Sequence, residues 1–570
     1  MEFLDLPDDV LLLVFSNLYG EYALNVALTS KRLSALALPR VAAMIECNGR
    51  QHLRRLHAYL LSDTHTRAQY VRTLAIEVYT FKRDGVPDPP DIAPEIWQIH
   101  DDTFYDDVSQ AHLIGDILLH SFNICELALE RFQPCLQRDP RIGIALSSMT
   151  NLRHLRLSVL GDAALSVLQS SQSDITRLTL SYHTQEDLPL PDEPKTMPVL
   201  LDALAHFRNL RILKLWNFNP DLDLSAHYHT SGYTPPELPS VVYLRISESS
   251  VPALDMVRLC PSLRTLIFSV HIDFDMPFPS VPIEPYTAQS PSWRPLRRLM
   301  LSEHFEVGYV LKRLGRVDLL QIGGDLMNQD EVTRFLDLLR VTSPIELYLS
   351  VIPSTLPSNF WPDFVRATPR LRVLELKVDV PQMANTHVEL LVSGAYCGAR
   401  PRELSECSSQ NALPGILAQL PVPCLRLYFP MPQLMLRRDE ARVGAQRPTA
   451  QEQEIRRIEA LRSLPQRLIN TMPSLRYLAV LDGGRHESLL QGWVDVDDSD
   501  SEDKGRARTV YEWDELRHTD HIRSTKWWRV VDGPEGRTLQ RITEQEGERM
   551  QQAFVDDERE ASEDALTGTP

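Results

Sequence analysis

The hexapeptide LRILKL, residues 210–215, alternates apolar and basic side chains over its second half. In an extended chain Leu213 and Leu215 point to one side and Lys214 to the other, which is the pattern of a half-buried β-strand. A single strand of this kind cannot bury its leucines, whereas copies stacked side by side bury them in a continuous column. The motif therefore predicts one strand of a repeated array.

The pattern Leu-x-x-Leu-x-Leu recurs along most of the chain after residue 50. The other clear copies lie at residues 152–157, 263–266, 296–301, 371–376 and 475–478. Weaker copies lie at residues 71–74, 124–129, 175–180, 241–246, 345–349 and 424–427. The spacing is irregular compared with the roughly 20–29 residues of regular repeats of this kind. The long gaps between residues 374 and 427 and between 427 and 478 leave room for a degenerate copy in each.

Helical segments precede several copies of the motif, at residues 202–207, 255–259 and 331–339. They would cover the flank of the strands on which the leucines lie. The pattern resembles the leucine-rich-repeat family in a degenerate form. Regular repeats carry an asparagine after the strand motif, as Asn217 does here. Ser158 and Lys377 stand at this place in other copies, so the repeats are irregular. We therefore expect an α/β fold with an irregular leucine-rich-repeat-like solenoid over residues 50–490.

Residues 6–18, LPDDVLLLVFSNL, have the features of a helix start followed by an amphipathic helix. Pro7 suits the first helical position, where its missing N–H costs nothing, and the two aspartates after it favour the helix dipole. The apolar residues at helical spacing are Val10, Leu11, Val14, Phe15 and Leu18. This spacing predicts a helix with one apolar face.

Two more short helices are expected before residue 40. Gly20 is expected to end the first helix, and residues 21–28 to form the second. The third would begin at a Thr29 or Ser30 cap and stop at Pro39. Three helices this short cannot bury all their apolar surface among themselves, so one apolar face is left for a partner.

The order of these segments resembles an F-box, through the leading Leu6-Pro7, the aliphatic–aromatic helix and the segment from Thr29 to Leu33. Leu33 stands where many F-boxes carry a tryptophan. The resemblance implies an F-box domain over residues 1–45 that docks onto the Skp adaptor subunit of a Skp–cullin–F-box ubiquitin ligase, and through it onto a cullin. The implied adaptor contacts are Leu6, Pro7, Val10, Leu11, Val14, Phe15, Leu28, Lys31 and Leu33. The alternative is that the apolar residues simply form a small helical core.

The composition argues against several other kinds of partner. The net charge of −18 disfavours nucleic acid, which needs a clustered basic surface. No apolar run approaches the roughly 18 residues of a membrane span, and the acidic N-terminus lacks the features of a secretory signal. Seven scattered cysteines without a CxxC pair do not form a disulfide framework. We expect a protein of the cytosol or nucleus with no membrane association.

Many of the 41 prolines lie between the repeats. The stretches 85–94, 188–194, 274–295 and 399–448 are expected to be loops. Insertions in repeat proteins tend to emerge on one face, often the binding face. These loops are therefore candidate recognition elements, and the alternative is that they are plain solvated connections.

Residues 491–570 are expected to form an acidic, largely disordered tail. The run from Asp495 to Asp503 cannot bury a core, and its Ser499 and Ser501 would suit an acid-directed kinase. The apolar residues 527–531 could fold back onto the array, whereas residues 556–564 are expected to be free.

We find no motif for a phosphate loop, a dinucleotide fold, a zinc protease or a serine hydrolase. Gly323-Gly324 is interpreted as a turn, and the pair His227 and His229 as part of a surface loop. Cys397 and Cys407 lack a second pair of ligands, so a zinc site is not expected. No cofactor, metal or catalytic residue is predicted.

Together these features predict a non-catalytic substrate-recognition adaptor of a Skp–cullin–F-box ubiquitin ligase. The F-box would dock the Skp adaptor, and the repeat array would bind a protein substrate. One alternative is a protein-interaction scaffold that works independently of the ligase. Another is a hydrolase or transferase hidden in an irregular α/β body, which would need a pocket with convergent titratable groups.

Overall fold

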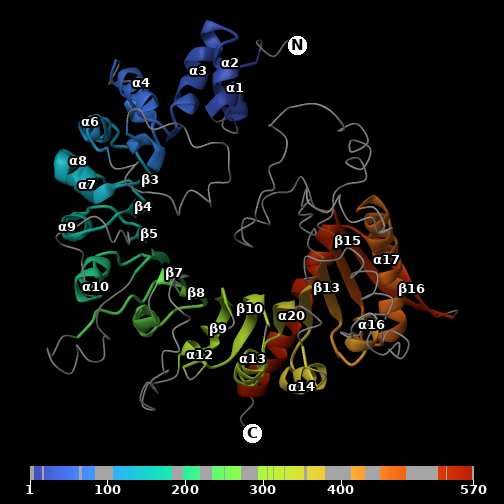
Figure 1. The fold of residues 1–570 in the computed structure, drawn as a ribbon. Coiled ribbons are helices and arrows are strands. Elements are labelled where there is room, and N and C mark those ends of the chain that lie inside the picture. Colours follow the sequence, from blue (N-terminus) through green and yellow to red (C-terminus); the bar gives the residue numbers. More distant parts are fainter. Residues whose placement is uncertain are drawn as a thin grey trace, which may run out of the picture. The chain divides into compact units, whose positions relative to one another are not determined.

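The structure of the chain is a computed structural model (Figure 1). It describes residues 6–15, 18, 20–62, 67–83, 107–182, 197–218, 234–249, 251–270, 293–303, 306–311, 313–326, 328–351, 356–357, 359–378, 413–429, 450–482, 524–534 and 536–567. The chain divides into two compact units, residues 1–279 and 280–570, and each is described by itself.

The first unit begins with the three predicted helices, α1 (Asp8–Phe15), α2 (Gly20–Ala27) and α3 (Lys31–Val41). Two predicted boundaries are wrong. Gly20 does not end the first helix but begins α2, and Pro39 does not stop α3, which runs on to Val41. Pro39 has no N–H to donate to the carbonyl of Ala35, so this bond of the ladder is missing, and α3 continues past Pro39 by less than one turn.

The rest of the first unit is a parallel sheet with helices between its strands. Its strands are β1 (Met44–Cys47), β2 (Thr73–Ile76), β3 (Glu126–Leu129), β4 (His154–Ser158), β5 (Arg177–Ser181), β6 (Ile212–Trp216), β7 (Tyr243–Ser249) and β8 (Thr265–Val270). Its α-helices are α4 (Arg50–Leu61), α6 (Ala111–His120), α7 (Phe132–Arg138), α8 (Arg141–Ser148), α9 (Asp162–Ser170) and α10 (Met197–Ala205). The 3₁₀ segments are η2 (Ala68–Tyr70), η3 (Val78–Phe81) and η5 (Val251–Leu259).

The leucines of the sequence motif form a column through this sheet. Strands β2 to β8 are paired in parallel so that the second leucines of successive copies are register partners. These leucines are at most 3% exposed: Leu74, Leu127, Leu155, Leu178, Leu213, Leu244 and Leu266. The prediction of a strand at each motif copy is confirmed in this unit, and each strand begins two residues after the first apolar residue of its copy.

The second unit is also a parallel sheet with helices between its strands, and its last two strands are antiparallel. Its parallel strands are β9 (Leu296–Leu301), β10 (Val317–Asp325), β11 (Glu346–Val351), β12 (Val373–Val378), β13 (Cys424–Phe429) and β14 (Tyr477–Asp482). Two antiparallel strands follow, β15 (Ser524–Gly533) and β16 (Gly536–Ile542). Its helices are α12 (Val307–Val310), α13 (Gln329–Thr342), α14 (Phe360–Ala367), α16 (Leu413–Leu417), α17 (Ala450–Thr471) and α20 (Glu544–Thr567).

The pairing of the second unit corrects two predictions. Strand β12 pairs directly with β13 and β13 with β14, so neither long gap in the motif spacing inserts a further strand between them. Gly323 and Gly324 do not form a turn but lie within β10. A Cβ atom at Gly323 would overlap the carbonyl oxygen of Ser302, which explains why a glycine stands there.

The C-terminal region is folded where disorder was expected. In residues 524–567 the structure places β15, β16 and the long helix α20. Trp527 is buried, as the predicted folding back of residues 527–531 requires. The prediction that residues 556–564 are free is wrong, because Glu558 and Arg559 make ion pairs with side chains of the array.

Several predicted features lie outside the described residues. They are the acidic run 495–503 with Ser499 and Ser501, the loops 85–94 and 188–194, most of the stretches 274–295 and 399–448, the pair His227 and His229, and Cys397 and Cys407. Among the helices that the structure does describe, none is both long and apolar enough to span a membrane.

Candidate functional site

The three N-terminal helices share a small apolar core. Leu11 and Phe15 of α1 pack against Leu33 and Ala37 of α3, and all four are at most 3% exposed. Partly buried residues of the module surround this cluster: Leu6, Leu18, Val26, Ala27 and Leu36. Leu11 and Phe15 are one turn apart, so this core uses one edge of α1 and leaves the rest of the helix outside it.

The outside of α1 and α2 is unusually apolar. Seven large apolar side chains there are between 37% and 75% exposed: Val10, Leu12, Leu13, Val14, Tyr22, Leu24 and Leu28. They are half of all the exposed large apolar side chains among the described residues, gathered in a segment of about twenty residues. We call this set the apolar surface. Contiguous exposed apolar residues of this kind mark a protein-binding surface.

The helical geometry groups these side chains further. On α1, Val10, Leu13 and Val14 stand at i, i+3 and i+4, so they line one side of the helix. Leu24 and Leu28 are likewise one turn apart, and the N–H of Leu28 donates to the carbonyl of Leu24 at 3.0 Å, so the helical path continues past the end of α2. The two rows give a partner apolar contacts from two different helices.

The nine predicted adaptor contacts divide into two groups. Pro7, Val10, Val14, Leu28 and Lys31 are exposed, where a partner can touch them. Leu11, Phe15 and Leu33 are buried in the core, and Leu6 is partly buried. The prediction therefore combined surface residues with the core that supports them. It did not include four exposed members of the apolar surface, Leu12, Leu13, Tyr22 and Leu24.

Polar contacts hold the three helices in their arrangement. Arg32 at the start of α3 donates from Nη2 to Asp8 Oδ1 at 2.6 Å and to the carbonyl of Leu6 at 2.8 Å. Ser30 caps α3 by accepting from the N–H of Leu33 at 3.2 Å, as one of the two predicted caps. These contacts attach the N-terminus of α1 to α3, so the apolar surface has a fixed support.

Replacing Ser30 with alanine removes the hydrogen bond to the N–H of Leu33. We expect the free energy of unfolding of the three-helix module to fall by about 1 kcal/mol. Because the apolar surface itself is untouched, adaptor binding should weaken only as far as α3 frays. Helical circular dichroism during thermal unfolding measures this loss, and Ser30→Asp, which keeps a capping oxygen, should restore it. No difference between alanine and aspartate would show that the cap does not hold α3.

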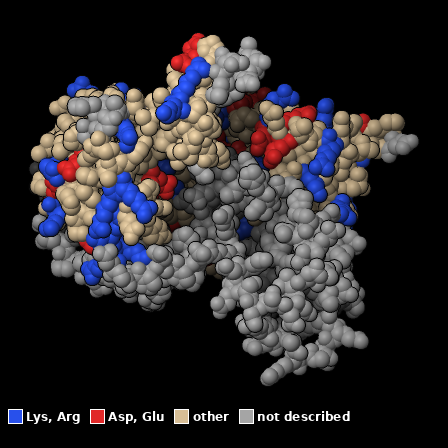
Figure 2. All heavy atoms as spheres, turned by 90° about the horizontal axis from the view of Figure 1, so that it is seen from above, with Lys and Arg blue, Asp and Glu red and all other residues tan. Residues whose placement is uncertain are grey.

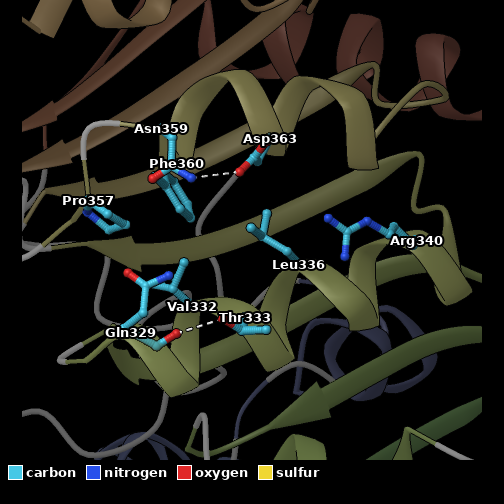
Figure 3. Close-up of a pocket in the computed structure, with 9 residues that line it drawn as sticks. All are labelled: Gln329, Val332, Thr333, Leu336, Arg340, Pro357, Asn359, Phe360 and Asp363. Atoms are coloured by element: carbon cyan, nitrogen blue, oxygen red, sulfur yellow. Dashed lines mark hydrogen bonds between the residues drawn. The ribbon is translucent and has the colours of Figure 1, made fainter.

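The second unit has a small pocket. It has a volume of about 130 Å³ and lies between α13 and α14. Its wall carries Asp363 and Arg340 among apolar and amide side chains (Figure 3). Asp363 accepts a hydrogen bond from Asn359 Nδ2 at 3.0 Å and pairs with Arg366, while Arg340 pairs with Asp337. The charged groups of the pocket are thus paired with neighbours on their own helices rather than directed at a common point.

Four of the five cysteines that the structure describes are buried: Cys47, Cys135, Cys260 and Cys424. Burial raises the pKa of Cys260 and of Cys424 to about 12, and it also raises the pKa of Cys135. A nucleophilic cysteine needs the opposite shift, toward the thiolate. Within the part of the chain that the structure describes, no group of three or more His, Cys, Asp or Glu side chains could hold a metal ion.

Positive and negative side chains both occur on the face of the molecule that Figure 2 shows. Figure 2 shows lysine and arginine side chains interspersed with aspartate, glutamate and uncharged residues over the described part of that face.

Comparison with known protein families identifies the three-helix module. Residues 3–38 match the family model of the F-box domain, which spans α1, α2 and most of α3. F-box domains bind the Skp adaptor and thereby cullin-based complexes, so the match implies an adaptor-binding role for this module. A search of curated proteins found no match to the chain.

Proposed function

We propose that this F-box domain-containing protein is a substrate-recognition adaptor of a Skp–cullin–F-box ubiquitin ligase. The observation that carries the proposal is the F-box match over helices whose outer side is the apolar surface. A module that exposes that many apolar side chains has the chemistry of a docking site for a partner protein.

The apolar surface would make the main contact with the Skp adaptor. Leu13 and Leu28 are 71% and 75% exposed, so they have the most surface to remove from water. Pro7 and Lys31 are exposed at the beginnings of α1 and α3 and would make contacts at the rim. Leu11, Phe15 and Leu33 would support the interface from below without touching the partner.

The array would hold the protein substrate. Its parallel strands alternate with helices, and its leucines form in-register columns, which supports a leucine-rich-repeat-like solenoid. Such arrays bind partners through the exposed residues of their strands and loops. The protein would supply no catalytic group of its own and would act in the cytosol or nucleus by bringing the substrate close to the ubiquitin-charged enzyme.

Affinity capture from cell extract tests this proposal. The intact chain is compared with a variant that carries Leu6→Ala and Pro7→Ala and with a variant that carries Leu13→Asp and Leu28→Asp. We expect the intact chain to retain the Skp adaptor and a cullin, and the aspartate variant to lose both. The first variant should weaken capture less, because Leu6 is partly buried and Pro7 makes a rim contact.

The capture has two outcomes that contradict the proposal. If the intact chain retains the adaptor without a cullin, the protein is a ligase-independent scaffold. If it retains neither, the adaptor-docking role fails and the array remains as a free-standing binding surface. Addition of purified cullin to the captured complex separates a true lack of affinity from a low amount of cullin in the extract.

A further inference from the structure

Helix α20 lies on the face of the second unit's sheet that does not carry the leucine column. In β11, Leu347 and Leu349 are fully buried, and Glu346 and Tyr348, which alternate with them, point to the opposite side. We call this opposite side the strand face. Gln551 of α20 donates from Nε2 to Glu346 Oε1 at 2.7 Å. The helix therefore covers the strand face, where the strands of the array would otherwise meet a partner.

The strand face carries an apolar row under α20. Val373, Cys424 and Tyr477 are register partners on β12, β13 and β14 and are buried in one cluster. Helix α20 adds Val555 to this cluster, and Phe554 packs against it with its ring centre 5.8 Å from that of Tyr477. The first half of the helix is thus held by apolar contacts.

Ion pairs attach the second half of α20 to the strand face. Glu558 pairs with Arg372 at 2.8 Å, and Arg559 pairs with Asp318 at 3.0 Å. The four side chains are between 16% and 35% exposed, so water weakens both pairs. A segment held by such pairs opens at a lower free-energy cost than one held by a core. The second half of α20 is therefore the part that can leave the sheet first.

Arg370 is matched poorly by the carboxylates around it. Its guanidinium lies 3.5 Å from Glu558 and 3.9 Å from Asp318, distances at or beyond the limit of a hydrogen bond. Its Nη1 donates to the carbonyl of Ser343 at 2.8 Å. Burial and the neighbouring Arg316 lower the pKa of Arg370, so its positive charge is compensated only in part. A carboxylate placed closer to Arg370 than Glu558 would bind this face more strongly than α20 does.

The sequence of α20 makes it an acidic amphipathic helix on a short tether. It has nine acidic residues against two basic ones, and Gln551, Val555 and Glu558 stand at i, i+4 and i+7 on the side toward the sheet. Thr543 alone separates it from β16 and accepts from the N–H of Glu546 at 3.2 Å as its cap. A segment tethered so closely meets its site at an effective concentration of about millimolar. It occupies the strand face unless a ligand binds better.

We propose that α20 is an autoinhibitory segment, which occupies the strand face until an acidic amphipathic helix of a protein substrate displaces it. The carboxylates of the substrate helix would pair with Arg370 and Arg372, and its apolar side would cover Tyr477 and Trp527. Closer pairing with Arg370 gives the substrate its advantage over α20. This inference rests on the proposed function, because it names the class of substrate segment that the array takes and the element that controls its entry.

Fluorescence anisotropy with the full chain tests the proposal. The probe is a fluorescein-labelled peptide of residues 544–567, which has the required acidic amphipathic character. Glu558→Arg removes the pairs with Arg370 and Arg372 from the tethered helix and leaves the strand face unchanged. We expect this variant to bind the peptide at least about tenfold more tightly than the unaltered chain, because apparent affinity rises with the fraction of molecules whose site is open. Asp557→Arg is the matched control, an equal charge change at an exposed position of α20, and should bind as the unaltered chain does.

Limited proteolysis measures the opening of α20 without a peptide. The helix should be cleaved earlier in Glu558→Arg than in the unaltered chain. Adding Arg372→Glu to Glu558→Arg restores a pair of opposite charges, so cleavage should become late again. Circular dichroism shows that the variants remain folded, which separates opening of the helix from unfolding of the second unit.

Three outcomes would overturn the proposal. Equal peptide binding by Glu558→Arg and the unaltered chain shows that α20 does not compete for the strand face. Absence of binding to Glu558→Arg up to about 1 mM peptide shows that α20 is a permanent part of the fold. Equal tightening by Asp557→Arg shows a general charge effect. Adaptor capture is measured on the same variants and should be unchanged, so a failure of the ligase role is separate from a failure of the autoinhibitory role.

Discussion

Replacement of both Leu13 and Leu28 with aspartate is expected to weaken binding of the Skp adaptor at least about 100-fold, or roughly 2.7 kcal/mol. The two leucines are 71% and 75% exposed and contribute little to the core of the three-helix module. In a complex they would be removed from water, and a carboxylate at either position would have to be buried without a partner. Isothermal titration calorimetry with purified adaptor measures the affinity, and circular dichroism shows whether the module remains folded.

A matched control uses apolar residues that are exposed elsewhere. Leu119 and Ile144 are 42% and 64% exposed on α6 and α8, so Leu119→Asp with Ile144→Asp adds the same charges away from the apolar surface. This control should bind the adaptor normally. Leu11→Ala should also lose binding, but through unfolding, because Leu11 is fully buried and its truncation costs about 2–5 kcal/mol. A folded Leu13 and Leu28 variant that keeps full affinity would place the adaptor on another surface.

The N-terminal helix shows why sequence alone could not separate contact residues from core residues. Residues 10–15, VLLLVF, are apolar on every side of the helix, so periodicity identifies an apolar helix without saying which side faces inward. Packing against α3 makes that choice, since Leu33 and Ala37 select Leu11 and Phe15. The unbroken apolar run was itself a usable signal, because a core this small cannot bury it all.

The strands were predictable where the leucine pattern is strict. Leu155, Leu213 and Leu374 lie in strands at the expected places, because alternation and burial agree there. Strand β1 was missed because Met44–Cys47 contains no leucine motif, and β10 was cut short by the interpretation of its glycines as a turn. These strands are specified by their neighbours in the sheet rather than by their own composition.

The folded C-terminal region was missed because residues 491–570 were judged by their overall acidic composition, which does not show the individual strands and helix. An acidic segment was expected to repel itself and stay open. In α20 the carboxylate of Glu558 instead meets Arg370 and Arg372, which lie on another part of the chain almost two hundred residues earlier. Charge compensation at that distance in sequence cannot be recognised from one segment. Whether the repeats belong to the leucine-rich-repeat family stays a prediction.

Trp527→Ala is expected to destabilise the second unit by about 3–5 kcal/mol, because it removes a large, fully buried side chain. The indole is only 1% exposed and joins Tyr477, Ala479 and Val555 in one cluster between β14, β15 and α20. Gly547 of α20 lies so close to the ring that a Cβ atom there would overlap it. Loss of the indole therefore leaves a cavity at the point where the helix, the two antiparallel strands and the parallel sheet meet. Urea denaturation, followed by circular dichroism, measures the change.

Trp528→Ala supplies the matched control, because it removes the same side chain from the neighbouring position, which is only partly buried. It should cost at most about half as much, since part of its surface already contacts water. Gly547→Ala should weaken the unit through overlap with the ring of Trp527 instead of through a cavity, and it should be rescued in part when combined with Trp527→Phe. Limited proteolysis reports the local consequence: α20 should be cleaved early in the Trp527 and Gly547 variants and late in the Trp528 variant. If Trp527→Ala leaves both the urea midpoint and the cleavage rate unchanged, α20 is attached by its arginine–carboxylate pairs alone, and the cluster around Trp527 does not hold the C-terminal region on the sheet.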